Sequence, residues 1–242
     1  GPWANSYDRW RNDNLTNRYQ GVQFGYTSAG RYTSWNDIWS YPGYKERDIL
    51  PGDYKYEDWN GDGEINGQDE HPFAFDQTPW LQFSLNAGLQ WKNLDFNMLL
   101  QGSALGSMEY KEPLHEIWGK NGGGALTQFL DRWHPVDPKA DPYDPSTVWT
   151  SGHYAYTGRW AKNNSAFNRV STAYLRLKSI ELGYTFPKLK QIPNASLRIY
   201  ANAYNLLTFT GVKFVDPEHP DDDLGRMYPL NKTYTLGVSL SF

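Results

Sequence analysis

The residues best suited to chemistry in this sequence lie in a short acidic loop, residues 58–69. With Asp58 as position 1, oxygen-bearing side chains follow at positions 3, 5, 9 and 12, glycine stands at position 6 and isoleucine at position 8. This is the spacing of calcium-binding loops, where a hard cation collects about six to eight oxygens and the glycine permits a sharp turn. The sequence therefore predicts a Ca²⁺ site whose ligands are Asp58, Asn60, Asp62, Glu64 (through its backbone carbonyl), Asn66 and Asp69.

Two features bear on the strength of this metal prediction. Position 12 is Asp69 and not the usual glutamate, so bidentate closure of the ligand shell is less assured. Asn-Gly and Asp-Gly pairs also build ordinary turns in surface loops, and that alternative stays open. Pro51 and Pro72 flank the loop closely and leave little room for helices beside it. We therefore expect a free-standing loop that stiffens an extended connection, and not a helix-loop-helix hand.

Other reactive side chains form weaker patterns. The five histidines are scattered, cysteine is absent, and neither a Gly-x-Ser-x-Gly nor a His-Glu-x-x-His motif occurs. Glu218 and Asp222 offer a carboxylate pair of the kind that glycosidases use, but acid-rich loops are usually just solvated. We therefore expect that the protein is not an enzyme.

The composition narrows the class of protein. Of the 242 residues, 39% are hydrophobic and no long apolar run occurs, which excludes helical membrane spans. Hydropathy is nearly blind to membrane β-strands, because only one face of each strand is apolar. The aromatic share of 17% suits both the aromatic girdles of membrane barrels and glycan-binding surfaces. A net charge of -4 without a Lys/Arg block argues against nucleic-acid binding.

Long runs of alternating apolar and polar residues predict the elements that position these side chains. Residues 80–91 and 94–103 alternate on either side of a tight turn at Lys92-Asn93, with Leu99 as the exception. Such strands are longer than the five or six residues typical of soluble proteins, although the strands of a two-sheet sandwich also alternate. Residues 171–186 change phase near Lys178, which predicts either a bulge there or a first half that stands above a membrane with its apolar side turned inward.

The last two strands complete the pattern. A strand from about residue 195 has Arg198, Tyr200, Asn202 and Tyr204 on its polar side, and we expect these four side chains to face a barrel lumen. Residues 231–242 alternate up to an aromatic end at Phe242. About ten residues, apolar toward lipid and polar toward the lumen, is the pattern of a transmembrane β-barrel strand. The expected fold class is all-β, a segment of an antiparallel transmembrane β-barrel with long extracellular loops.

The connections between the expected strands alternate in length. They are long before residue 80, short at 92–93, long over 104–170, short near 187–195 and long over 208–230. Because outer-membrane barrels have short periplasmic turns and long outer loops, we expect a periplasmic carboxyl terminus and an extracellular calcium loop. The long stretches favour a first strand at 21–32, a loop at 34–51 and a short helix at 126–133. Six strands cannot close a membrane barrel, so the chain is expected to be part of one.

Four ordered stretches carry a resemblance to a known family. Residues 51–63 (PGDYKYEDWNGDG), 91–103 (WKNLDFNMLLQGS), 173–184 (AYLRLKSIELGY) and 234–242 (YTLGVSLSF) resemble the last quarter of SusC-like TonB-dependent outer-membrane transporters, the SusC/RagA family. The resemblance covers about residues 20–242 and is more specific than the calcium loop alone. It implies a 22-stranded barrel in a Gram-negative outer membrane. Residues 1–242 would supply about its last six strands, and the plug domain and earlier strands are not in this chain.

The resemblance also implies partners and a function. It implies active import of glycans or peptides together with a SusD-like surface lipoprotein, energised by TonB through the missing plug region. The remaining barrel and plug, on the same or another polypeptide, and outer-membrane lipid would be further partners. The terminal Phe242 resembles the signal that outer-membrane insertion machinery recognises. Residues 1–10 have neither a basic start nor an apolar run, so we expect any export signal on sequence not present here.

One alternative belongs to a different class. A soluble calcium-dependent carbohydrate-binding β module would explain the aromatic residues and the acidic loop. It would not explain the alternation of short and long connections, nor a final strand that ends on an aromatic residue.

Overall fold

The structure, a computed structural model, describes residues 18, 20–42, 49–111, 114, 115, 117, 125–156, 164–187, 195–218 and 227–242. The chain divides into two compact units, which are described separately. The first unit draws on residues 1–77, 107–170 and 220–226, and the second on residues 78–106, 171–219 and 227–242. Within the described ranges, no helix has the length and apolar character needed to cross a membrane.

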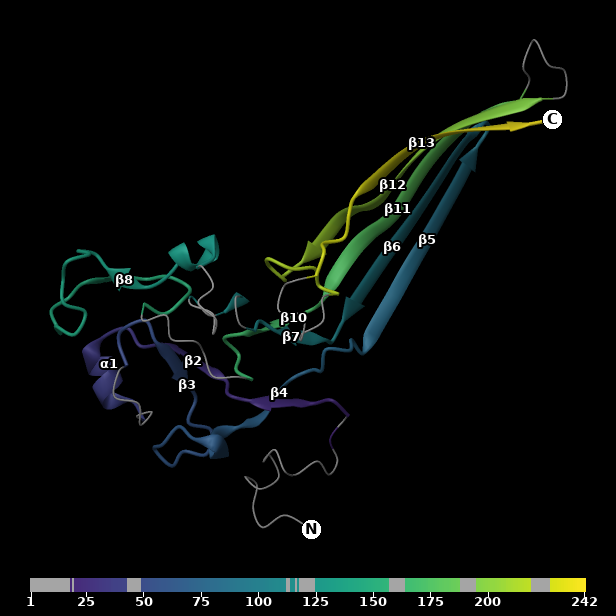
Figure 1. The fold of residues 1–242 in the computed structure, drawn as a ribbon. Coiled ribbons are helices and arrows are strands. Elements are labelled where there is room, and N and C mark those ends of the chain that lie inside the picture. Colours follow the sequence, from purple (N-terminus) through teal and green to yellow (C-terminus); the bar gives the residue numbers. More distant parts are fainter. Residues whose placement is uncertain are drawn as a thin grey trace. The chain divides into compact units, whose positions relative to one another are not determined.

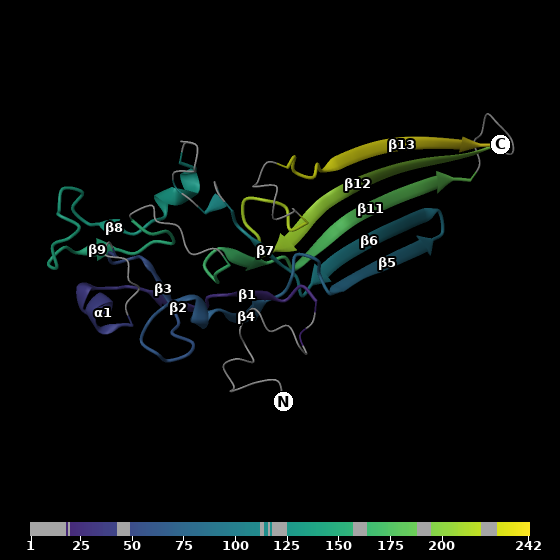
Figure 2. The same cartoon turned by 60° about the horizontal axis from the view of Figure 1, so that its bottom comes forward.

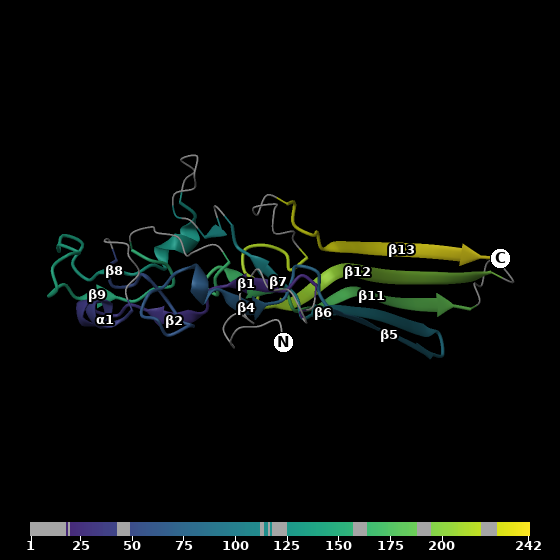
Figure 3. The same ribbon diagram turned by 90° about the horizontal axis from the view of Figure 1, so that it is seen from below.

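The second unit is an antiparallel sheet of five long strands (Figure 1). The strands are β5 (Leu81–Trp91), β6 (Leu94–Ala104), β11 (Tyr174–Phe186), β12 (Ser196–Thr210) and β13 (Thr233–Ser241), in the spatial order β13-β12-β11-β6-β5. Figures 2 and 3 show the same five strands running alongside one another. Among the described strands the sheet does not close, because β13 and β5 each have a neighbour on one side only.

The register places the short connections at one end of this sheet. Trp91 pairs with Leu94 across the turn at Lys92-Asn93, where Lys92 has a φ of 52°. Phe186 pairs with Leu197, and Ser196 pairs with Ser241 near the end of the chain. The tight turn, the end of β11 and the end of β13 therefore lie together, as Figure 1 shows.

Alternation separates the side chains of the sheet onto two faces. One face is apolar and contains Phe83, Leu100, Leu182, Ile199 and Leu236, whose cross-strand partners are also mostly apolar or small. The opposite face is mostly polar. Leu99, the exception noted in the sequence, lies on the polar face opposite Asn86 and Ser179.

A bulge resolves the phase change in residues 171–186. The register of β11 shifts between Leu177 and Ser179 against both of its neighbours, so Lys178 takes up the extra position. Leu175 and Ile180, on either side of the bulge, pair with Phe209 and Ala203 and so share the apolar face. Asn205 of β12 has a φ of 53° and marks the matching irregularity on the next strand. Of the two alternatives, the bulge is therefore the correct one.

The first unit is built from short strands and loops. Its strand pairs are β1 (Gln23–Gly25) with β4 (His71–Ala74), β2 (Ser28–Arg31) with β3 (Tyr54–Tyr56), β7 (Ser107–Glu109) with β10 (Arg169–Ser171), and β8 (His134–Pro135) with β9 (Trp149–Thr150). Its helical segments are α1 (Trp35–Ser40), η2 (Gly67–Asp69) and η4 (Thr127–Leu130). One buried cluster joins Tyr26, Tyr56 and Ile65, and another joins Ile117, Phe129 and Tyr154.

The structure corrects three local expectations. The single strand at 21–32 is two short strands in separate two-stranded sheets, so the long sheet has five described strands and not six. The loop expected at 34–51 contains helix α1, because the side chain of Ser34 caps it by accepting a hydrogen bond from the Asp37 backbone N–H. The helix expected near 126–133 is a single 3₁₀ turn, η4.

Candidate functional site: an acidic loop and a polar sheet face

The first half of the acidic loop winds around its own oxygen side chains. The Asp58 carboxylate accepts hydrogen bonds from the backbone N–H groups of Gly61, at 2.8 Å, and Gly63, at 2.9 Å. Asn60 Oδ1 accepts from the Asp62 N–H, and the Asn60 amide donates to Asp62 at 2.9 Å. Gly61 and Gly63 have φ values of 73° and 83°, a left-handed conformation that favours glycine. The structure thus brings three of the six predicted ligands together.

The second half of the loop closes on Asp69. This buried carboxylate accepts from the backbone N–H groups of Trp59, at 2.9 Å, Asn60, at 3.4 Å, and Asn66, at 2.7 Å. Asn66 in turn accepts from the N–H of Gln68 and caps η2. Burial raises the pKa of the Asp69 carboxyl, and the three backbone N–H donors only partly offset that effect. Asp69, at position 12, therefore connects the end of the loop to the backbone at positions 2, 3 and 9.

The loop is held against the rest of the first unit by one buried apolar side chain and one stacked ring pair. Ile65, at position 8, is buried against Tyr26 and Tyr56. Trp59, at position 2, stacks on the ring of His71 at 3.7 Å between ring centres. These contacts hold the loop in place from both of its halves.

The donor set fits a hard cation, because it contains only carboxylate, amide and backbone oxygens. In the part of the chain that the structure describes, however, no three histidine, cysteine, aspartate or glutamate side chains converge as a metal centre. The carboxylates of Asp58 and Asp69 are instead turned toward backbone N–H groups. The calcium site therefore stays a prediction.

The four side chains predicted to face a lumen do share the polar face of the sheet. Arg198 donates to both oxygens of Asp95 and, at 2.7 Å, to Glu181. Asn202 also donates to Glu181, at 3.4 Å. A Cβ atom on Gly183 would overlap the Arg198 guanidinium and the Asp95 carboxylate. Arg198 therefore lies flat across β11 toward β6, and glycine at position 183 leaves room for it.

Tyr200 lies across the sheet in the other direction. A Cβ on Gly237 of β13 would overlap the Tyr200 ring, so the ring covers that glycine. The Arg198 guanidinium also lies 4.7 Å from the centre of the same ring. Tyr204 pairs with Thr233 and Ser179 on the same face. The direction of this face relative to a lumen stays a prediction.

A second arginine on the polar face was not identified from the sequence. Arg176 of β11 donates to Asp216 and to Glu218, each at 2.6 Å, and Tyr174 donates to Glu218 at 2.8 Å. Glu218, one of the two carboxylates considered for glycosidase chemistry, is thus held in an ion pair. Its suggested partner Asp222 lies outside the described residues. The sequence offered one weak signal for this ion pair: a basic residue at a polar strand position, followed about 40 residues later by an acidic loop.

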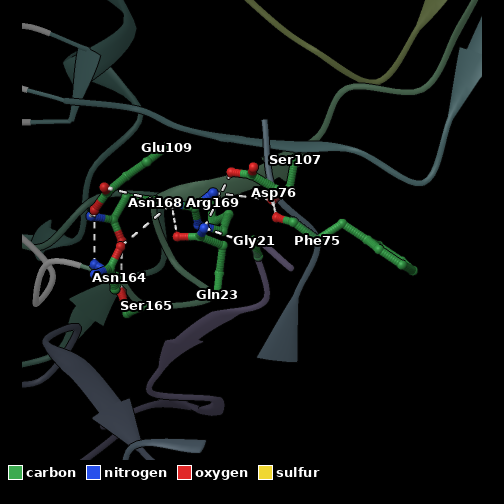
Figure 4. Close-up of polar contacts among 10 residues, drawn as sticks. All are labelled: Gly21, Gln23, Phe75, Asp76, Ser107, Glu109, Asn164, Ser165, Asn168 and Arg169. Atoms are coloured by element: carbon green, nitrogen blue, oxygen red, sulfur yellow. Dashed lines mark hydrogen bonds and ion pairs between the residues drawn. The ribbon is translucent and has the colours of Figure 1, made fainter. Parts of the chain in front are cut away.

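The first unit has a buried polar cluster of its own (Figure 4). Glu109 accepts hydrogen bonds from the Asn164 N–H at 2.8 Å and from the Asn168 amide at 3.2 Å, and it lies 3.8 Å from Arg169. Arg169 also donates to Ser107 and to Gln23. The cluster joins β1, β7 and β10, and we interpret it as structural support.

An antiparallel sheet with one apolar face, one polar face and short connections at one end is consistent with a fragment of a membrane β-barrel. No protein-family model matches the chain. Two TonB-dependent receptors of Formosa agariphila are similar to it. P3 is 28% identical over 81% of this chain, and P26 is 27% identical over 93%. The chain spans 19% and 22% of those two proteins, about a fifth of their length.

Solved structures agree with these relatives. The RagAB peptide transporter matches 92% of this chain with a TM-score of 0.54 at 21% identity, and this chain covers 21% of it. The RagAB peptide importer in its open-open state matches 90% of this chain with a TM-score of 0.55 at 19% identity, and this chain covers 22% of it. At such identities the match establishes the fold alone. Together with the receptor homologues, it confirms the resemblance to SusC-like TonB-dependent transporters of the SusC/RagA family.

Proposed function

We propose that this chain is part of the barrel wall of an outer-membrane active transporter. It imports glycans or peptides together with a SusD-like surface lipoprotein and is energised through TonB. The remaining barrel strands pair with the free edges of β5 and β13. The carboxyl terminus faces the periplasm, and the acidic loop faces outside.

The observation that carries this proposal is the unbroken apolar face of the five-stranded sheet. The bulge at Lys178 keeps that face on one side over the full length of β11. Several of its large side chains are exposed, among them Leu85, Trp91, Phe209, Leu236 and Val238. An exposed apolar face of this extent is unfavourable in water and favourable against lipid. The receptor homologues and the RagAB likeness support the same assignment.

Fractionation and uptake in cells test the proposal. The full-length protein should be found in the outer membrane and should require detergent for extraction. Cells should accumulate a labelled oligopeptide mixture or labelled oligosaccharides, and loss of TonB should abolish that uptake. A full-length protein that fractionates as a soluble monomer would contradict the membrane assignment. It would favour the soluble carbohydrate-binding alternative instead.

We further propose that the loop 58–69 binds Ca²⁺ and thereby stiffens the first unit. Support comes from the all-oxygen donor set and from Ile65, which connects the loop to the buried Tyr26 and Tyr56. An ion that binds only the folded state stabilises it by about 2.7 kcal/mol at 100 times its dissociation constant.

Thermal unfolding with added Ca²⁺ or with a chelator tests the metal proposal. The melting temperature of the wild-type protein should rise with Ca²⁺, and Asp62→Ala should abolish that rise. Glu64→Gln is the matched control, because Glu64 contributes its backbone carbonyl and should keep the Ca²⁺ response. If Asp62→Ala responds to Ca²⁺ as the wild type does, the loop is a plain turn cluster.

A further inference from the structure

The strongest unexplained feature of the sheet is the buried charge of Arg176. Its side chain is only 1% exposed, although it lies on the polar face between Gln101 and Thr208. Its guanidinium donates to Asp216 and Glu218, each at 2.6 Å, and to the Thr208 hydroxyl at 3.0 Å. Removal of the carboxylate partners of a buried arginine strongly destabilises the folded state, because the buried charge is then left uncompensated. Residues 211–218, which supply both carboxylates, are therefore held against the sheet.

The loop 211–218 has further contacts with the sheet. Tyr174 donates its hydroxyl hydrogen to Glu218 at 2.8 Å, and the Val212 N–H donates to the hydroxyl of Thr210, the last residue of β12, at 3.1 Å. Val212 is buried, whereas Phe214 is 57% exposed. Phe214 also has a φ of 71°, in a region that bulky residues rarely adopt. A strained backbone of this kind persists only where the surrounding contacts enforce it.

We propose that Arg176 is the anchor of a latch that keeps the loop 211–218 folded over the polar face of the sheet. The side chains of β6, β11 and β12 beneath the loop are then covered. A molecule that moves along this face meets the loop, with its exposed Phe214, and not the strands. This last statement rests on the proposed transport function, whereas the latch itself does not.

Limited proteolysis of the full-length protein in detergent tests the latch. Lys213 is an exposed trypsin site inside the loop, and cleavage needs a locally opened chain. The wild-type protein should resist cleavage after Lys213. Arg176→Met should increase the rate of that cleavage by at least about tenfold, because it leaves two carboxylates without their cation. Mass spectrometry of the new peptide that begins at Phe214 gives the rate.

The matched control is Arg198→Met. Arg198 is also a polar-face arginine with two carboxylate partners, but those partners, Asp95 and Glu181, lie on strands. Its loss should leave cleavage after Lys213 unchanged. If Arg176→Met does not fold, Glu218→Gln and Asp216→Asn remove one carboxylate each from the loop side and should also accelerate the cleavage.

Two results would overturn the latch. One is cleavage after Lys213 in the wild-type protein as fast as in the Arg176 and Glu218 variants. The other is equal acceleration by Arg198→Met, which would point to general loosening of the sheet. Because proteolysis requires no substrate, failure of the latch leaves the uptake results untouched. Loss of TonB-dependent uptake would likewise leave the latch untouched.

Discussion

The first unit buries two clusters of aromatic and apolar side chains, whereas in the sheet of the second unit many large apolar side chains are exposed. Phe129 of the first unit is 1% exposed, and Phe209 on the apolar face of the sheet is 63% exposed. The first unit buries aromatic clusters with little regular structure around them. The second has regular strands, and among the described residues many side chains of its apolar face are exposed.

This difference shows where each unit obtains its stability. The first unit buries apolar clusters of its own. The inner strands β12, β11 and β6 satisfy their backbone groups by pairing on both sides, and the exposed apolar face of the sheet is favoured by an apolar surrounding. The same residue type therefore has a different energetic role in each unit, and substitutions can test this.

The largest expected effect comes from truncating the hidden aromatic. Phe129→Ala should lower the stability of the first unit by about 3–5 kcal/mol, because it opens a cavity against Ile117 and Tyr154. In lipid, Phe209→Ala should have a smaller effect, because acyl chains fill the space and no cavity remains. Hydrogen exchange of the two regions in lipid vesicles measures both. Equal effects would remove the distinction between the units.

The next effect comes from a charge on the apolar face. Leu236→Arg should destabilise the protein in lipid vesicles by about 2–4 kcal/mol, measured by urea unfolding. Thr235→Arg, one residue away on the polar face, is the matched control and should be tolerated much better. If both changes are equally harmful, the two faces of β13 do not differ in environment.

A smaller effect concerns the packing of the Tyr200 ring over Gly237 on the polar face. Gly237→Ala should destabilise the sheet by about 1–3 kcal/mol, because the new methyl group overlaps the Tyr200 ring. Gly211→Ala is the control, since no atom lies within 4 Å of the added Cβ. The second change Tyr200→Ala should reduce the penalty of Gly237→Ala. A double-mutant cycle that shows no coupling would mean that the ring does not cover the glycine.

The smallest predicted effect is a pH dependence in the first unit. Burial alone raises the pKa of Asp37, but hydrogen bonds from Lys55 and Thr33 outweigh it and leave the pKa below its usual value. The folded state therefore gains stability above the ordinary aspartate pKa and loses it as the pH falls below about 4. We expect about 0.5 kcal/mol, measured by thermal unfolding against pH. Asp37→Asn should remove this part of the pH dependence, and an unchanged profile would contradict the assignment.

The long strands could be predicted from the sequence because alternation is a local signal. Residues 80–91 and 94–103 correspond closely to β5 and β6, and the turn at Lys92-Asn93 joins them as expected. The phase change near Lys178 was visible, but only the pairing with β6 and β12 could decide between its two explanations. Helix α1 was missed because its signal is the cap at Ser34 and not an apolar period.

The polar contacts were harder to predict because they join distant residues. The sequence predicted that Arg198 and Tyr200 share a polar face. It did not predict that Arg198 lies flat over Gly183 and that Tyr200 covers Gly237. The contact between Arg176 and Glu218 spans 42 residues, so no local pattern reveals it. The acidic loop is the opposite case, since its candidate ligands lie within twelve residues and its turns follow from local spacing.

Site-directed spin labelling along β13 tests the central claim most directly. The chain has no cysteine, so in an otherwise cysteine-free full-length protein a single label can be placed at each position from 233 to 241. In lipid vesicles, collisions with oxygen should be frequent at Tyr234, Leu236, Val238 and Leu240, and collisions with a water-soluble nickel chelate should be infrequent there. The positions between them should show less contact with oxygen, giving a period of two residues. Equal access of the nickel chelate to both faces would contradict the account.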